Sequence, residues 1–277
     1  MPAASAPRYR GMDRAALDAA YNNRNAVAAY PAIAAERVKR SERVRASRKH
    51  HADLRYGATG RERLDIFPAG RTGAPLLAFI HGGYWQTNDK EASSYLVEGP
   101  LAHGVSVALI EYTLAPEADI ERIVGEVGRA VDWLAARARD FGADPSRIFV
   151  SGHSAGGHLT AMMLGKRAVA GALAISGLYD LEPIRLCYLN EKLRLTEASA
   201  ERHSPLRRLP ARRAPVVVAV GAAELPELVR QSAEYAAALG VPLLALEGHD
   251  HFSVLEELAR PDGALCRELL ALAATPA

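Results

Sequence analysis

A serine stands in the middle of residues 151–157, which read SGHSAGG. An apolar run precedes this stretch and a helix-like segment follows it, so the pattern predicts a strand, a sharp turn and a helix with Ser154 at the turn. Gly152 and Gly156 flank the serine because so tight a bend leaves little room for side chains. The bend would present the hydroxyl at the helix N-terminus, where developing negative charge is favoured. Ser154 is therefore the first candidate for a covalent nucleophile.

A structural turn could carry the same pattern, so a second segment matters. Residues 76–85 read LLAFIHGGYW, which predicts a buried strand that runs into a loop of small residues. Such a loop allows the backbone N–H groups of Gly83 and Tyr84 to turn toward the carbonyl oxygen that Ser154 would attack, beside the N–H of Ala155. The two motifs in this order predict a nucleophile with an oxyanion hole.

A serine hydroxyl is a poor nucleophile without a base, and in this arrangement the chain order is serine, acid, histidine. Of the nine histidines, His249 and His251 alone follow the last predicted strand, at 243–246. We favour His251, because His251-Phe252 followed by the amphipathic segment 253–258 is typical of this ending. The two histidines could also suggest a metal site, but zinc needs three or four ligands and no partner cluster is visible. We predict no metal and no cofactor.

The acid should come from the loop after the preceding strand, at 215–220. Glu224 lies close to the end of that strand and twenty-seven residues before His251, so its carboxylate can meet the imidazole. Glu227 is the alternative. It is expected to begin the next helix, where a carboxylate is favoured in any case by the helix dipole. We therefore prefer Glu224.

These residues need a scaffold of strands that end near one another. Apolar runs without polar alternation predict a mostly parallel sheet covered on both faces by helices. The runs lie at 75–80, 105–111, 147–150, 171–175, 215–220 and 243–246. Two short strands, at 51–56 and 62–67, and helices near 14–21 and 31–49 precede them.

Two further segments complete the predicted architecture. The helix at about 119–141 has an apolar face that should pack on the sheet. That face is formed by Ile120, Ile123, Val124, Val127, Val131 and Leu134. Residues 177–210 break the alternation of strands and helices and are expected to form a small cap over the site.

Length and composition fit one α/β domain over residues 1–277, with an N-terminal helical segment at about 1–50. A net charge of +2 and 6% aromatic residues give no indication of a nucleic-acid partner. The basic stretch 37–49 is interpreted as a solvated helix. Two cysteines, no apolar leader and no membrane-length apolar run indicate a reduced, cytoplasmic protein without a membrane partner. A homodimer is compatible with the sequence.

The motifs resemble the α/β-hydrolase superfamily, and within it the kynurenine formamidase (arylformamidase) family and its bacterial esterase-like relatives. The resemblance runs from about residue 21 to residue 258. It is carried by HGGYW at 81–85, by SGLYDLEPI at 176–184 with the cap residues after it, and by ELPELVRQS at 224–232. In the family an aspartate often stands at the position of Glu224, so this chain carries one additional methylene there.

The resemblance implies the triad Ser154, Glu224 and His251, and hydrolysis of an aryl formamide such as N-formylkynurenine without a cofactor. Bacterial relatives resemble esterases of small acyl esters, so a carboxylesterase with the same machinery is the first alternative. A non-catalytic ligand-binding member of the fold is the second. The residues expected to line the substrate pocket are Tyr84, Trp85, Leu178, Tyr179, Tyr188 and Phe252.

Overall fold

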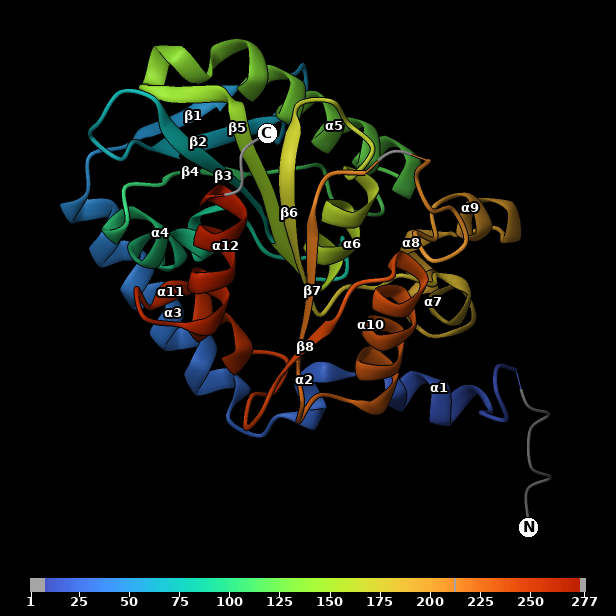
Figure 1. Ribbon diagram of the computed structural model, residues 1–277. Coiled ribbons are helices and arrows are strands. Elements are labelled where there is room, and N and C mark those ends of the chain that lie inside the picture. Colours follow the sequence, from blue (N-terminus) through green and yellow to red (C-terminus); the bar gives the residue numbers. More distant parts are fainter. Residues whose placement is uncertain (1–7, 212, 275–277) are drawn as a thin grey trace.

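The centre of the computed structural model is a single mixed sheet (Figure 1). The structure describes residues 8–211 and 213–274, so the start of the expected N-terminal segment lies outside the described residues. Within them, the sheet has eight strands in the order β1-β2-β4-β3-β5-β6-β7-β8. The strands are β1 (His51–Arg55), β2 (Arg63–Phe67), β3 (Ala74–Ile80), β4 (Ser106–Ile110), β5 (Ala143–His153), β6 (Val169–Ile175), β7 (Val216–Gly221) and β8 (Leu243–Leu246).

Strand direction confirms the predicted mostly parallel sheet. The pairs β1–β2 and β2–β4 are antiparallel, whereas β4, β3, β5, β6, β7 and β8 run parallel to one another. Parallel neighbours need long crossover connections, and helices supply most of them here. The loops that follow the parallel strands therefore meet at one edge of the sheet, which is where sites form in such folds.

Helices fill the connections between strands and frame the ends of the chain. The longer ones are α1 (Arg14–Ala20), α3 (Tyr30–Ser47), α5 (Ile120–Arg137), α6 (Ala155–Met162), α10 (Pro226–Leu239) and α12 (Ala264–Ala274). The shorter ones are α2 (Asn23–Ala26), α4 (Glu98–Ala102), α7 (Glu182–Leu186), α8 (Asn190–Leu193), α9 (Glu197–Arg202) and α11 (Glu256–Ala259), with 3₁₀ helices at Glu91–Val97, Ala138–Phe141 and Ser253–Leu255.

The sheet buries apolar side chains on both faces, as its unalternating runs predict. Along β3, Leu76, Ala78 and Ile80 face the side covered by α5 and α6, where the predicted apolar face of α5 packs. Leu77 and Phe79 face the other side, together with residues of α3, α11 and α12. Figure 1 shows α3, α4, α11 and α12 gathered on that side. The sheet is thus the middle layer of three.

The segment 177–210 carries the short helices α7, α8 and α9. Its apolar residues, among them Leu181, Ile184 and Leu193, join the same core as α5 and α6. The segment is therefore fixed by burial on the body of the protein. Among the described residues, both cysteines are free and buried, and no helix is long and apolar enough to cross a membrane.

Candidate active site

Ser154 occupies the turn between β5 and α6. Its backbone has φ 58° and ψ −118°, a conformation that residues other than glycine rarely adopt. Its backbone N–H donates to the Ile175 carbonyl at 2.9 Å, which holds the turn against β6. A Cβ on Gly152 would lie 2.4 Å from the Gly156 oxygen, and one on Gly156 would lie 2.0 Å from the Ile80 oxygen. Both positions therefore require glycine for the steric reason that the sequence suggests.

The loop after β3 also has an unusual backbone. Gly83, Tyr84 and Trp85 have φ values of 115°, 51° and 57°. The Gly83 carbonyl accepts from the N–H groups of Gln86 and Thr87 at 3.0 and 3.1 Å. Among the described residues, the N–H groups of Gly83 and Tyr84 have no hydrogen-bond acceptor. Two donors in a partly buried loop are thus left available for a ligand.

This loop lies directly against the serine turn. A Cβ on Gly82 would meet the His153 oxygen at 2.7 Å and the Ser154 Cβ at 3.1 Å. Ala155 begins α6, and its N–H likewise has no acceptor within the described part of the chain. Donors from two segments therefore lie next to the serine, as an oxyanion hole requires.

His251 and Glu224 are joined by a short hydrogen bond. The Nδ1 atom of His251 lies 2.6 Å from Oε2 of Glu224, and both side chains are buried. The other carboxylate oxygen, Oε1, accepts from the Ser176 hydroxyl at 2.5 Å and from the Gly221 N–H at 2.8 Å. With Oε1 held in this way, Oε2 is directed to the imidazole. Ser176 is a site residue that the sequence reasoning missed.

The two alternative residues have other partners. Glu227 accepts from the Tyr21 hydroxyl at 3.0 Å and pairs with Arg230 at 2.6 Å. His249 lies 3.5 Å from Glu257. Over the described residues, neither side chain forms a hydrogen bond or an ion pair with Glu224 or His251, although Glu227 is three residues from Glu224 and His249 is two residues from His251.

His153 precedes Ser154 in the chain and lines the same cavity as Ser154 and His251. Its ring lies 4.4 Å from the His251 ring. Burial, together with His251 and Arg37, lowers the pKa of His153 well below its usual value. A neutral ring at this position adds no positive charge beside His251.

Ser154 and His251 line one cavity of about 330 Å³, a volume suited to a small molecule. The two side chains make no direct hydrogen bond to each other. Of the residues predicted to bind substrate, Tyr84, Tyr188 and Phe252 lie on the cavity wall. The cap contributes Tyr188 and Leu189 to that wall.

Trp85, Leu178 and Tyr179 do not line this cavity, which corrects the expectation from the sequence. All three have 0% of their surface exposed. Trp85 packs edge-on against His158, with ring centroids 5.0 Å apart, and Tyr179 stacks on Tyr235 at 4.2 Å. All three belong instead to the hydrophobic core, where burial of large apolar groups is favourable.

The N-terminal segment forms part of the site, which the sequence reasoning did not foresee. Asn23, Arg24, Tyr30 and Arg37 line the cavity. Asn23 donates to the Tyr84 hydroxyl at 2.9 Å, so the segment also holds the loop after β3. A cluster of three asparagines at 22–25 is a weak signal that could have suggested a loop with a polar role.

Over residues 8–211 and 213–274, no group of three or more His, Cys, Asp or Glu side chains could hold a metal ion.

Comparison with known proteins gives consistent matches. The BD-FAE family model matches residues 64–173. Kynurenine formamidase of Danio rerio is 33% identical over 250 residues, which are 83% of this chain and 84% of the relative. That of Salmo salar is 34% identical over 252 residues, with the same shares. A Silicibacter structure provisionally called a thioesterase has TM-score 0.84 at 31% identity, over 92% of this chain and 98% of that one.

A thermostable carboxylesterase from a metagenomic library shares the fold, with TM-score 0.72 at 20% identity over 87% of this chain and 96% of that chain. The strand order, the turn at Ser154 and the loop after β3 define an α/β hydrolase. Within that class, the chain belongs to the kynurenine formamidase family, and it is a hydrolase.

Proposed function

We propose that this protein is a serine hydrolase that removes a small acyl group, in particular formyl, from an aryl amide such as N-formylkynurenine. The observation that carries the proposal is the Glu224–His251 hydrogen bond on the same cavity as Ser154 and its free backbone donors. The family relatives are named for formamide hydrolysis, which gives the acyl group.

In the proposed mechanism, His251 accepts the proton of the Ser154 hydroxyl while the serine oxygen bonds to the formyl carbon. The N–H groups of Gly83, Tyr84 and Ala155 stabilise the resulting oxyanion. His251 then donates that proton to the leaving nitrogen as the C–N bond breaks, and the aryl amine departs. Water, activated by the same histidine, cleaves the formyl ester to formate and restores Ser154.

Glu224 orients the imidazole through Nδ1 and stabilises its positive charge. The missing hydrogen bond between Ser154 and His251 is compatible with this role, because such bonds often tighten only when a substrate is bound. Tyr84, Tyr188 and Phe252 are proposed to contact the aryl group, since their rings stand on the cavity wall.

The test is a substrate panel that varies the acyl and the leaving group separately. We expect higher kcat/KM for N-formylkynurenine and formanilide than for p-nitrophenyl octanoate, with acetate esters between. Each misfitting methylene should cost about 1–3 kcal/mol, or roughly tenfold to two-hundredfold. Chelators should leave the rates unchanged.

Two outcomes would overturn the proposal. Turnover of acetate esters without turnover of any formamide would make the protein a carboxylesterase with the same machinery. Absence of turnover, together with no reaction between Ser154 and a fluorophosphonate, would indicate a ligand-binding member of the fold.

A further inference from the structure

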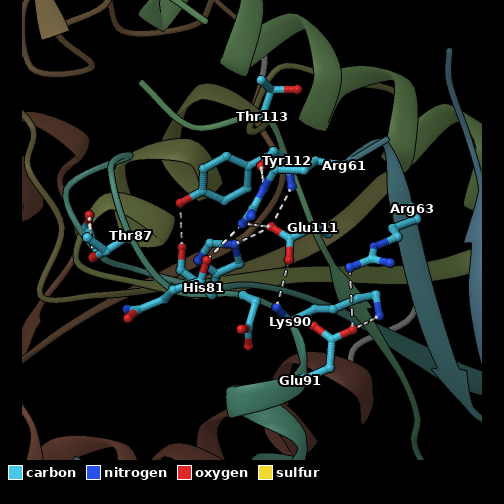
Figure 2. Close-up of polar contacts among 12 residues, drawn as sticks. Arg61, Arg63, His81, Thr87, Lys90, Glu91, Glu111, Tyr112 and Thr113 are labelled. Carbon is cyan, nitrogen blue, oxygen red and sulfur yellow. Dashed lines mark hydrogen bonds and ion pairs between the residues drawn. The ribbon is translucent and has the colours of Figure 1, made fainter. Parts of the chain in front are cut away.

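His81 and Glu111 lie side by side (Figure 2). They are the first residues after β3 and β4, and the two strands pair Ile80 with Ile110. The parallel register therefore brings the next residue of each strand together. His81 is 2% exposed and Glu111 is 0% exposed.

Both ring nitrogens of His81 face oxygen acceptors. Nδ1 lies 2.8 Å from the Gly82 carbonyl oxygen, and Nε2 lies 2.9 Å from Oε1 of Glu111. A carbonyl oxygen can only accept, and a neutral imidazole has one N–H. A neutral His81 would thus hold a nitrogen lone pair against an oxygen lone pair in a buried place.

Glu111 cannot supply the missing proton, because its carboxylate is surrounded by donors. Oε1 also accepts from the Arg61 guanidinium at 2.7 Å and from the Tyr112 N–H at 3.1 Å, and Oε2 accepts from the Lys90 N–H at 3.0 Å. Burial raises the pKa of Glu111, but apart from any charge on His81 the Arg61 guanidinium and the Lys90 N–H lower it. Glu111 is ionised over the working pH range.

We propose that His81 is an imidazolium, protonated at both nitrogens, that positions the oxyanion hole through the Gly82–Gly83 peptide. This inference rests on the proposed function of the Gly83 N–H. A trans peptide is planar, so its C=O and N–H point in opposite directions. The Nδ1–H bond fixes the Gly82 oxygen on the protein side and thereby fixes the Gly83 N–H on the side of the ligand.

Other contacts support the same arrangement. The Asn88 amide also donates to the Gly82 oxygen at 3.2 Å, and the Tyr112 hydroxyl donates to the His81 carbonyl at 3.0 Å. The Tyr112 ring stacks on the imidazole at 4.4 Å and 10°, where a π face favours a cation. The Lys90 ammonium pairs with Asp65 at 2.9 Å and with Asp53 at 3.0 Å, and Arg63 pairs with Asp53 at 3.1 Å. His81 is thus a positioning residue that also brings positive charge near the developing oxyanion.

The direct test is ¹⁵N NMR of the histidine ring nitrogens in the whole protein at pH 7, with the His81 signals assigned by their loss in His81→Asn. We expect both His81 nitrogens to carry protons. One unprotonated nitrogen would overturn the proposal. This measurement needs no turnover, so it stands apart from any failure of the proposed hydrolysis.

A kinetic test uses Glu111→Gln, in which an amide oxygen still accepts from Nε2 but no charge retains the second proton. We expect kcat on an ester substrate to fall about tenfold to a hundredfold between pH 6.5 and pH 9, with KM within about threefold, whereas the wild type stays level. Tyr112→Phe is the matched control. It removes one hydrogen bond from the network without a change at either ring nitrogen, and its pH profile should follow the wild type. A level profile in Glu111→Gln would contradict the proposal.

Discussion

At the scale of single residues, the pairing of His251 with Glu224 separates the two candidate bases. His249 lies beside Glu257 instead. We expect His251→Ala to lower kcat by about 10⁴-fold or more, because the base and the nucleophile act as a unit. His249→Ala should stay within about tenfold of the wild type. The measurement is steady-state kinetics with both variants on one substrate, and a reversed order would move the base to His249.

The acid can be tested in the same way. Glu224→Ala should lower kcat by less than Ser154→Ala, because the carboxylate only orients and stabilises the imidazolium. Ser176→Ala removes one donor to Glu224 and should cost about tenfold. Glu227→Ala, which loses contacts to Tyr21 and Arg230, should remain within about threefold. A silent Glu224→Ala beside an inactive Glu227→Ala would reassign the acid.

Residue identities near the strand ends could be predicted because their motifs are local. Ser154 and its two glycines follow from the steric demands of one turn. The role of Ser176 could not be predicted, since its contact with Glu224 spans 48 residues and depends on how β6 and β7 align. The roles of Ser154, Glu224 and His251 stay predictions until variants are measured.

At the scale of elements, the loop after β3 depends on Gly83. A Cβ there would lie 2.3 Å from the Thr87 oxygen at a φ of 115°. We expect Gly83→Ala to lower kcat by about 10²-fold or more, because the loop must shift its donors. Gly70→Ala is the matched control, since it introduces strain at φ 73° with nothing within 4 Å of the new Cβ.

Thermal unfolding measures the loss of stability in these two glycine variants separately from any loss of activity. Both variants should lose roughly 1–3 kcal/mol from backbone strain, but only Gly83→Ala should lose activity. Full activity in Gly83→Ala would show that the loop does not set the oxyanion donors.

The strands and the long helix were predictable because apolar runs and a 3.6-residue period reflect burial directly. β5 extends from Ala143 to His153, beyond the predicted 147–150. The start of the strand was missed because residues 144–147 are Asp, Pro, Ser and Arg, and none of the four is buried. The covering of the cavity by the N-terminal segment was not predictable. Asn23 meets Tyr84 across 61 residues, and no periodic pattern records such a contact.

At the scale of the whole molecule, buried neutral histidines should make the fold sensitive to acid. Burial lowers the pKa of His158 to about 3, from 6.5 in the unfolded chain. The unfolded chain therefore binds this proton first, so the contribution of His158 is intact above pH 6.5 and is lost as the pH falls toward 3. The slope should reach about 1.4 kcal/mol per pH unit.

The variant His158→Gln removes that titration while its amide can still donate to the His203 carbonyl. Chemical denaturation between pH 7 and pH 4.5 should show a shallower loss of stability than in the wild type. His103→Gln, at an exposed position, should retain the wild-type slope. If the free energy of unfolding fell equally steeply with pH in the wild type and in His158→Gln, the acid sensitivity could not come from His158.

The claim that Ser154 is the nucleophile is tested most directly by the intact mass of the whole chain after reaction with a fluorophosphonate. We predict one phosphonyl adduct, located on Ser154 by peptide mapping, loss of hydrolysis in step with its formation, and no adduct in Ser154→Ala. Hydrolysis that continues in the fully labelled protein, or an adduct that persists in Ser154→Ala, would contradict it.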